Sequence, residues 1–193
     1  MRRKGDPIAT ALLEMPSEKE QSALFNRMDY NGNGGLSLAE IDKACVELWP
    51  HFNNKPALMR AYKSADRNGD GFITRREFKK LLQYIIYFTG LWDKFESIDT
   101  DGDRRLNLQE FIVGSAIVGH PLSPSEAHAE FAAMDDNGGG VVLFDEFCVW
   151  CVERHVDKVT EAAHLEMARR GAKSFSGAPV RSHTSTLFYS DSS

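Results

Sequence analysis

The chain has 193 residues, of which 42% are hydrophobic and 26% are charged. These proportions are those of an ordinary globular protein and exclude collagen-like, low-complexity and largely disordered classes. The formal net charge of −5 argues against nucleic acid as a partner. Three cysteines are too few for a disulfide framework and favour a reducing, intracellular setting. The longest apolar stretch, residues 84–92, is too short to cross a bilayer.

The N-terminal segment, residues 1–16, is expected to be an extension rather than a targeting signal. Its first residues are basic, but no apolar segment follows them, so no secretory signal is predicted. Arg2 stands where an N-myristoylation motif requires glycine, and we therefore expect no acyl membrane anchor.

Four 12-residue segments share one pattern and begin at Asp29, Asp66, Asp99 and Asp135. Each starts with Asp, ends with Glu and has an aliphatic residue at position 8. An aromatic residue lies four positions before each segment, and a large apolar residue follows each terminal Glu. This is helical spacing on both sides of a polar loop, so each repeat is predicted to be a helix-loop-helix unit.

The loop pattern matches the requirements of a calcium ion, which takes about 6–8 oxygen ligands. Short side chains at positions 1, 3 and 5 supply oxygens, glycine at position 6 permits a sharp turn, and position 7 supplies its carbonyl. Position 9 often acts through a water, and Glu at position 12 binds with both oxygens. Since magnesium prefers a tighter octahedron, we expect it only as a competitor.

On these residues the chain resembles a four-EF-hand protein of the calmodulin superfamily over roughly residues 17–155. Residues 84–150 are more similar to the flagellar calcium-binding proteins of protists, the calflagin type, chiefly in 95–101, 108–111 and 141–147. The resemblance implies an all-α fold of two EF-hand pairs packed compactly. It also implies a cytoplasmic place in a cilium or flagellum. The membrane anchoring of such proteins does not carry over, because Arg2 replaces the acylated glycine.

Loops one and two fit the pattern at every ligand position. The predicted metal ligands of loop one are Asp29, Asn31, Asn33, Gly35 (carbonyl), Ser37 and Glu40. Those of loop two are Asp66, Asn68, Asp70, Phe72 (carbonyl), Thr74 and Glu77. The alternative for either loop is a paired but empty loop.

Loops three and four depart from the pattern. The predicted ligands of loop three are Asp99, Asp101, Asp103, Arg105 (carbonyl), Asn107 and Glu110. Arg104 occupies the glycine position there, at a cost of about 1–2 kcal/mol, and the alternative is a calcium-free loop. Loop four, Asp135 to Glu146, has Gly139 at position 5 and Leu143 at position 9, so we expect it to be weak or empty and to support loop three. Two to three calcium ions are therefore predicted.

The predicted division is an N-terminal lobe at 17–89, a C-terminal lobe at 90–155, and a helical extension with a Ser-rich flexible tail at 156–193. The connection between the lobes is apolar on nearly every side from Leu81 to Trp92, which indicates a helix that is buried on nearly every side. We expect the lobes to pack on each other, with Gly90 permitting a bend. The alternative is that an external partner covers the aromatic residues Tyr84, Tyr87 and Phe88.

Two features outside the loops have competing interpretations. Cys148, Cys151 and His155 share a helix face and could bind zinc, but Cys151 and Cys45 occupy equivalent core positions in their repeats, which favours burial. The apolar stripe Val156, Val159, Ala163 and Met167 could dock on the protein itself or on a partner, and the Ser-rich tail is expected to be mobile.

The leading functional hypothesis is a calcium sensor or adaptor that changes conformation and engages a protein target. The alternatives are a calcium buffer that hardly opens, and a structural subunit of a ciliary, axonemal or cytoskeletal assembly with calcium-tuned contacts. The sequence shows no catalytic constellation, so an enzyme is not predicted.

Overall fold

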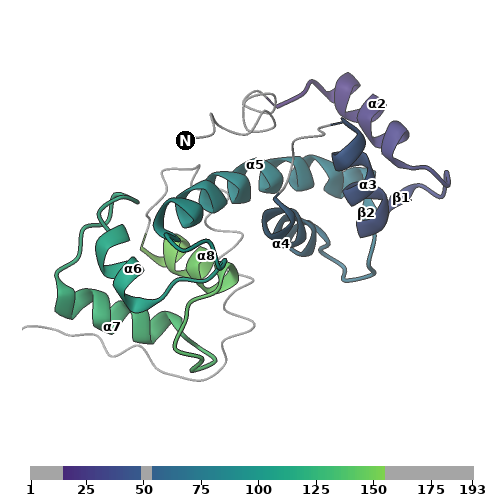
Figure 1. Ribbon diagram of the computed structural model, residues 1–193. Helices are drawn as coiled ribbons and strands as arrows, with labels where there is room; N and C mark the ends of the chain where they lie inside the picture. Colours follow the sequence, from purple (N-terminus) through teal and green to yellow (C-terminus); the bar gives the residue numbers. More distant parts are fainter. Residues whose placement is uncertain (1–14, 49–53, 155–193) are drawn as a thin grey trace, which may run out of the picture.

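The computed structural model describes residues 15–48 and 54–154, and its regular structure is almost entirely helical (Figure 1). The predicted N-terminal extension up to residue 14, His155, the stripe from Val156 to Met167 and the Ser-rich tail lie outside the described residues. The elements in chain order are α2 (Glu18–Met28), β1 (Gly35–Leu36), α3 (Leu38–Leu48), α4 (Lys55–Ala65), β2 (Ile73–Thr74), α5 (Arg75–Ile98), α6 (Leu108–Gly114), α7 (Pro124–Met134) and α8 (Phe144–Glu153).

Each incoming helix ends where its loop begins, and the aromatic residue four positions earlier accepts the last hydrogen bond. The backbone N–H of Asp29 donates to the carbonyl of Phe25 at 3.0 Å, and that of Asp99 donates to the carbonyl of Phe95 at 2.9 Å. The same bond recurs at the other two loops. The first aspartate is thus both hydrogen-bonded to the incoming helix and the first residue of the loop.

The loops pair through their position-8 residues. Strands β1 and β2 are antiparallel, with Leu36 opposite Ile73. Leu106 and Val142 form an isolated antiparallel bridge, with N–H to carbonyl distances of 2.9 and 2.8 Å. All four side chains are completely buried. The loops therefore pair as one with two and three with four, which gives an N-terminal and a C-terminal EF-hand lobe.

Helix α5 belongs to both lobes. Its 24 residues form the exiting helix of unit two and the incoming helix of unit three. Gly90 lies inside this helix, so the lobes are joined by continuous helix rather than by a turn at that glycine. In Figure 1 the elements of the N-terminal lobe gather around one end of α5, and α6, α7 and α8 lie at the other.

The apolar sides of α5 are buried, as its sequence predicts. Helix α4 packs along α5, where the Arg60 guanidinium lies 5.5 Å from the centre of the Phe88 ring. Farther along, Trp92 and Phe95 meet Phe144 of α8, with ring centroids 4.9 and 5.6 Å apart. Tyr84, Tyr87 and Phe88 are also buried, so these residues do not form an exposed surface for an external partner.

The cysteines behave as core residues. Cys45, Cys148 and Cys151 are all buried, which confirms the interpretation based on repeat alignment. Burial raises the pKa of the Cys45 thiol to about 12, with a smaller contribution from Asp42, so this thiol stays protonated at neutral pH.

Two glycines test the helix packing. A Cβ at Gly114 would lie 2.3 Å from Ile98 Cγ2, where α6 approaches α5, whereas a Cβ at Gly90 would meet nothing within 4 Å. Gly114→Ala should lower the free energy of unfolding by about 1–3 kcal/mol through overpacking. The matched control Gly90→Ala should raise it by about 0.5–1 kcal/mol, because alanine is the better helix former. Urea unfolding in chelator measures both, and equal effects of the two variants would contradict the packing.

Candidate calcium-binding loops

The first aspartate organises each loop by accepting hydrogen bonds from backbone N–H groups. In loop two, Asp66 accepts from Gly69 at 2.8 Å and from Gly71 at 3.0 Å, one bond on each carboxylate oxygen. The first aspartates of loops one, three and four also accept on both oxygens, with one bond each from the residue at position 6 and one from position 4 or 5. The carboxylate at position 1 is therefore fixed at the inside of the turn.

The terminal glutamate closes each loop from the opposite side. Glu40, Glu77 and Glu110 are only 9%, 9% and 7% exposed. One carboxylate oxygen of each accepts the backbone N–H of position 9, at 3.0 Å in all three. This bond caps the glutamate's own helix, so the ligand at position 12 is held by the helix on which it lies.

The second oxygen of each terminal glutamate reaches across to the start of its loop. In loop two it accepts from the N–H of Arg67 at 3.1 Å. In loop three it accepts from both the N–H and the hydroxyl of Thr100 at 2.8 Å. Thr100, at position 2, has a role that sequence reasoning missed, because position 2 is variable in the loop pattern. The glutamates of loops two and three thus bring positions 2 and 12 together, whereas in loop one the second oxygen of Glu40 accepts from the Asn31 amide at position 3, at 2.9 Å.

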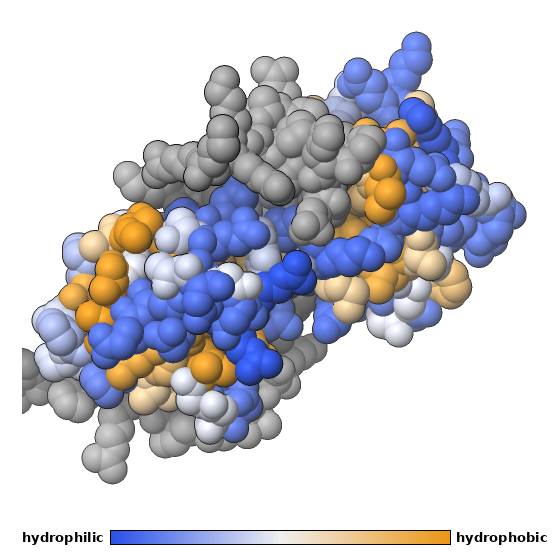
Figure 2. Space-filling model, viewed as in Figure 1, coloured by the Kyte–Doolittle hydropathy of each residue, from blue (hydrophilic) through white to orange (hydrophobic). Residues whose placement is uncertain are grey.

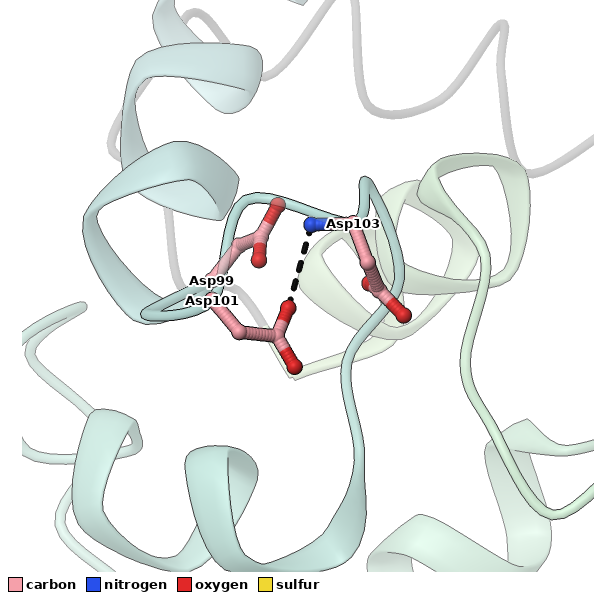
Figure 3. A group of neighbouring side chains, drawn as sticks. All are labelled: Asp99, Asp101 and Asp103. Atoms are coloured by element: carbon pink, nitrogen blue, oxygen red, sulfur yellow. Dashed lines mark hydrogen bonds between the residues drawn. The ribbon is translucent and has the colours of Figure 1, made fainter.

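Loop three contains a compact carboxylate cluster. One oxygen from each of Asp99, Asp101 and Asp103 lies within 4.8 Å of the others. Figure 3 shows the three side chains gathered inside the turn, with the N–H of Asp103 donating to Asp101 at 3.0 Å. This is the charge and oxygen density that a hard divalent cation prefers.

Burial and hydrogen bonds shift the pKa values of two acids in loop three in opposite directions. Burial raises the pKa of the Asp99 carboxyl above its ordinary value, and the charges of Glu110 and Asp103 raise it further, against hydrogen bonds from Arg104 and Gly102 that lower it. Burial also raises the pKa of Glu110, but the hydrogen bonds from Asn107, Thr100 and Asp101 outweigh it, so the net shift is downward. A divalent cation would relieve the repulsion that Asp99 experiences.

Arg104 adopts the conformation that glycine has in the other loops. Its φ is +65°, compared with +83° at Gly34 and +82° at Gly71. Its N–H donates to Asp99 at 2.9 Å, as the position-6 glycines do in their loops. Loop three therefore keeps the shared geometry despite the arginine. The left-handed backbone conformation of a non-glycine residue lowers the free energy of unfolding.

Loop four has the frame of the site without its full ligand set. Asp135 and Glu146 make the same capping bonds as in the other loops. Position 5 is Gly139, which supplies no side-chain oxygen, and the Asn137 amide donates to Glu146 at 2.7 Å, as the Asn31 amide donates to Glu40 at 2.9 Å in loop one. The structure thus gathers Asp99, Asp101 and Asp103 of loop three into one cluster. Hydrogen bonds join Asn31 to Glu40 in loop one and Asn68 to Asp70 in loop two, and loop four lacks a side-chain ligand at position 5.

Comparisons with known proteins agree with this geometry. The family model of the EF-hand domain pair matches residues 88–151, and EF-hand models match residues 57–88 and 21–46. The flagellar calcium-binding protein TB-24 of Trypanosoma brucei brucei is 30% identical over 151 residues, covering 72% of this chain and 69% of that protein. The chain belongs to the calmodulin superfamily of EF-hand proteins. The relatives similar to it are named calcium-binding proteins, and the chain is a calcium-binding EF-hand protein.

Two further relatives show how far the similarity extends. The flagellar calcium-binding protein TB-44A of the same trypanosome is 31% identical, over 72% of this chain but only 37% of that protein. The probable calcium-binding protein CML25 of Arabidopsis thaliana is 29% identical over 67% of this chain and 71% of its own length. A solved structure of a homologue of programmed cell death 6 protein from Leishmania major Friedlin matches at 23% identity and a TM-score of 0.41, over 72% of this chain and 74% of that one.

Within residues 15–48 and 54–154, no helix of this EF-hand protein combines the length and the apolar character needed to cross a bilayer.

The conformation of Arg104 makes a prediction about stability. Arg104→Gly should raise the free energy of unfolding by about 0.5–1 kcal/mol, because the relief of left-handed strain exceeds the added chain entropy. Arg104→Gln is the matched control, since it removes the charge and keeps the strained Cβ. Urea unfolding in the presence of chelator measures both variants. Equal stabilisation by the glutamine would show that charge, not backbone strain, is responsible.

Loop four lacks a side-chain oxygen at position 5, and this leads to a second prediction. Gly139→Asp should add one calcium site, because the frame around Asp135 and Glu146 is already formed. The added Cβ would approach the Asn137 side chain, with Oδ1 at 2.6 Å and Cγ at 3.7 Å, and that flexible side chain can move. Calorimetric titration should show one more ion bound per chain than in Gly139→Ala, and an unchanged number would contradict the prediction.

Proposed function

We propose that this protein is a calcium sensor whose loops one, two and three bind calcium and move the helices that follow them. The ligands in this proposal are the side chains at positions 1, 3, 5 and 12, the carbonyls of Gly35, Phe72 and Arg105, and position 9 directly or through water. Magnesium competes for these sites at rest. Loop four supports loop three through the bridge between Leu106 and Val142.

The observation that carries the proposal is the position of each terminal glutamate beside a core residue. Glu40 is followed by Ile41, Glu77 by Phe78 and Glu110 by Phe111, and each of these apolar residues is at most 2% exposed. A shift of the glutamate toward an ion must therefore move a residue packed in the lobe. An ion site isolated from the core would suit a buffer better than a sensor.

The core supplies the surface that such a movement would expose. Phe25 and Phe78 meet edge to face at 5.3 Å in the N-terminal lobe, and Phe95 and Phe147 meet at 5.5 Å in the C-terminal lobe. Separating the helices of a lobe would uncover these aromatic groups, which suit an amphipathic helix of a protein target. The trypanosome relatives are named flagellar calcium-binding proteins, which supports a place in a flagellum or cilium. We place the protein in the cytoplasm there, with its target in the axoneme or cytoskeleton.

The number of ions tests the assignment of ligands. Glu40→Gln, Glu77→Gln and Glu110→Gln should each lower the number of calcium ions bound per chain by one, because each removes one bidentate carboxylate. Glu146→Gln is the matched control and should leave the number unchanged. Isothermal titration calorimetry with magnesium present provides the count. An effect of the control equal to that of the other three would contradict the assignment.

The sensor proposal can be tested by measuring whether calcium exposes apolar surface. Calcium should produce a saturable rise in the fluorescence of the dye ANS, with magnesium present throughout, and Glu77→Gln should reduce that rise. A flat response with calorimetrically confirmed binding would favour the buffer. Retention in an isolated axonemal fraction after calcium is chelated would favour the structural subunit.

A further inference from the structure

Arg60 of α4 connects the two lobes. Its Nη1 lies 3.0 Å from Asp145 Oδ1, in the first turn of α8. The side chain of Arg60 is 25% exposed and that of Asp145 is 58% exposed. By contrast, the pair between Lys55 and Asp42, of similar length at 3.1 Å, lies within the N-terminal lobe. The pair at Arg60 thus crosses from unit two to unit four.

On the C-terminal side, the ion pair involves Asp145, whose position depends on the pairing of loops three and four. Asp145 follows Phe144, which packs against Trp92 of α5. Three residues before Asp145, Val142 exchanges two backbone hydrogen bonds with Leu106 of loop three. The position of Asp145 is therefore set by the loop three bridge on one side and by the aromatic cluster of α5 on the other.

On the N-terminal side, the ion pair reaches loop two. Arg60 lies in α4, which ends at Ala65, immediately before the first ligand position of that loop. The guanidinium also lies over the ring of Phe88, and its Nε is buried without a hydrogen-bond partner. Asp145 provides a charged partner to this half-buried cation, so loss of the contact would leave the cation poorly compensated.

We propose that the ion pair between Arg60 and Asp145 couples calcium binding at loop three to calcium binding at loop two. The inference rests on the proposed function, since it requires both loops to bind. An ion in loop three orders the bridge and the start of α8, which holds Asp145 in place for Arg60. Helix α4 is then positioned for loop two before its own ion arrives, so binding at one loop tightens binding at the other. For a partly exposed ion pair the effect is about two- to fivefold in affinity.

A cycle of variants in the full chain tests the coupling. Phe72→Trp places an indole at position 7 of loop two, and its fluorescence reports calcium binding there. In this background Glu110→Gln, which disables loop three, should weaken loop two by about two- to fivefold. With Arg60→Met added, Glu110→Gln should no longer change the affinity of loop two.

Further variants separate the effect of this ion pair from that of a surface charge lost elsewhere in the N-terminal lobe. Lys55→Met removes the pair within the N-terminal lobe and should leave the coupling intact. Asp145→Asn should abolish it as Arg60→Met does, and the reversed pair Arg60→Glu with Asp145→Arg should restore it. Persistence of the coupling in both Arg60→Met and Asp145→Asn, or its loss in Lys55→Met, would overturn the proposal.

Calorimetry distinguishes failure of the coupling from failure of the proposed function. If Glu110→Gln lowers the number of bound ions but leaves the affinity of loop two unchanged, the coupling alone is overturned. If it does not lower the number of ions, loop three is not a site, and both the ligand assignment and the coupling are overturned.

Discussion

The hydrogen-bonded carboxylate at the end of each loop is the interaction on which the rest of the structure depends. Glu77 caps the start of α5 through Thr74, closes loop two through Arg67 and adjoins the buried Phe78. A single side chain thus joins a helix end, an ion-binding loop and a hydrophobic core. Glu40 and Glu110 likewise cap their own helices and precede a buried residue. Each of the three candidate sites is therefore connected to the packed core of its lobe.

The shared helix α5 and the ion pair between Arg60 of α4 and Asp145 of α8 connect the two lobes. The aromatic residues of α5 are buried, and Figure 2 shows that apolar residues on the visible face form separate patches divided by hydrophilic side chains. Two exposed side chains of the C-terminal lobe, Val113 and Ile117, remain at 69% and 60% exposure. In the proposed sensor, most of the surface offered to a target comes from the core when the helices separate, rather than from the resting surface.

Local sequence patterns predicted the positions and the main features of the loops, because each loop is formed by residues that are close together in the sequence. The aliphatic residue at position 8 recurs in every loop sequence and is the residue through which the loops pair, and repeat alignment correctly placed Cys45 and Cys151 in the core. The effect of Gly90 was not predictable from the sequence, because a helix tolerates a glycine when the neighbouring turns are packed. Helix α5 continues through this residue. The contact of Arg60 with Asp145 joins residues far apart in sequence, and neither residue belongs to a repeated pattern. The sequence predicted that Arg104 at the glycine position would lower stability, but it did not predict that Arg104 would keep the glycine-like conformation.

The central claim is that ions bound in loops one to three move the lobe cores. Amide and methyl NMR spectra of the full chain during a calcium titration test it most directly. We expect the N–H signals of Gly34, Gly71 and Arg104, which donate to the first aspartates, to shift as ions bind, while that of Gly140 responds less. The methyl signals of Ile41 and Leu81 should shift at the same calcium ratios. Loop signals that shift while the core methyl signals stay fixed would contradict the claim.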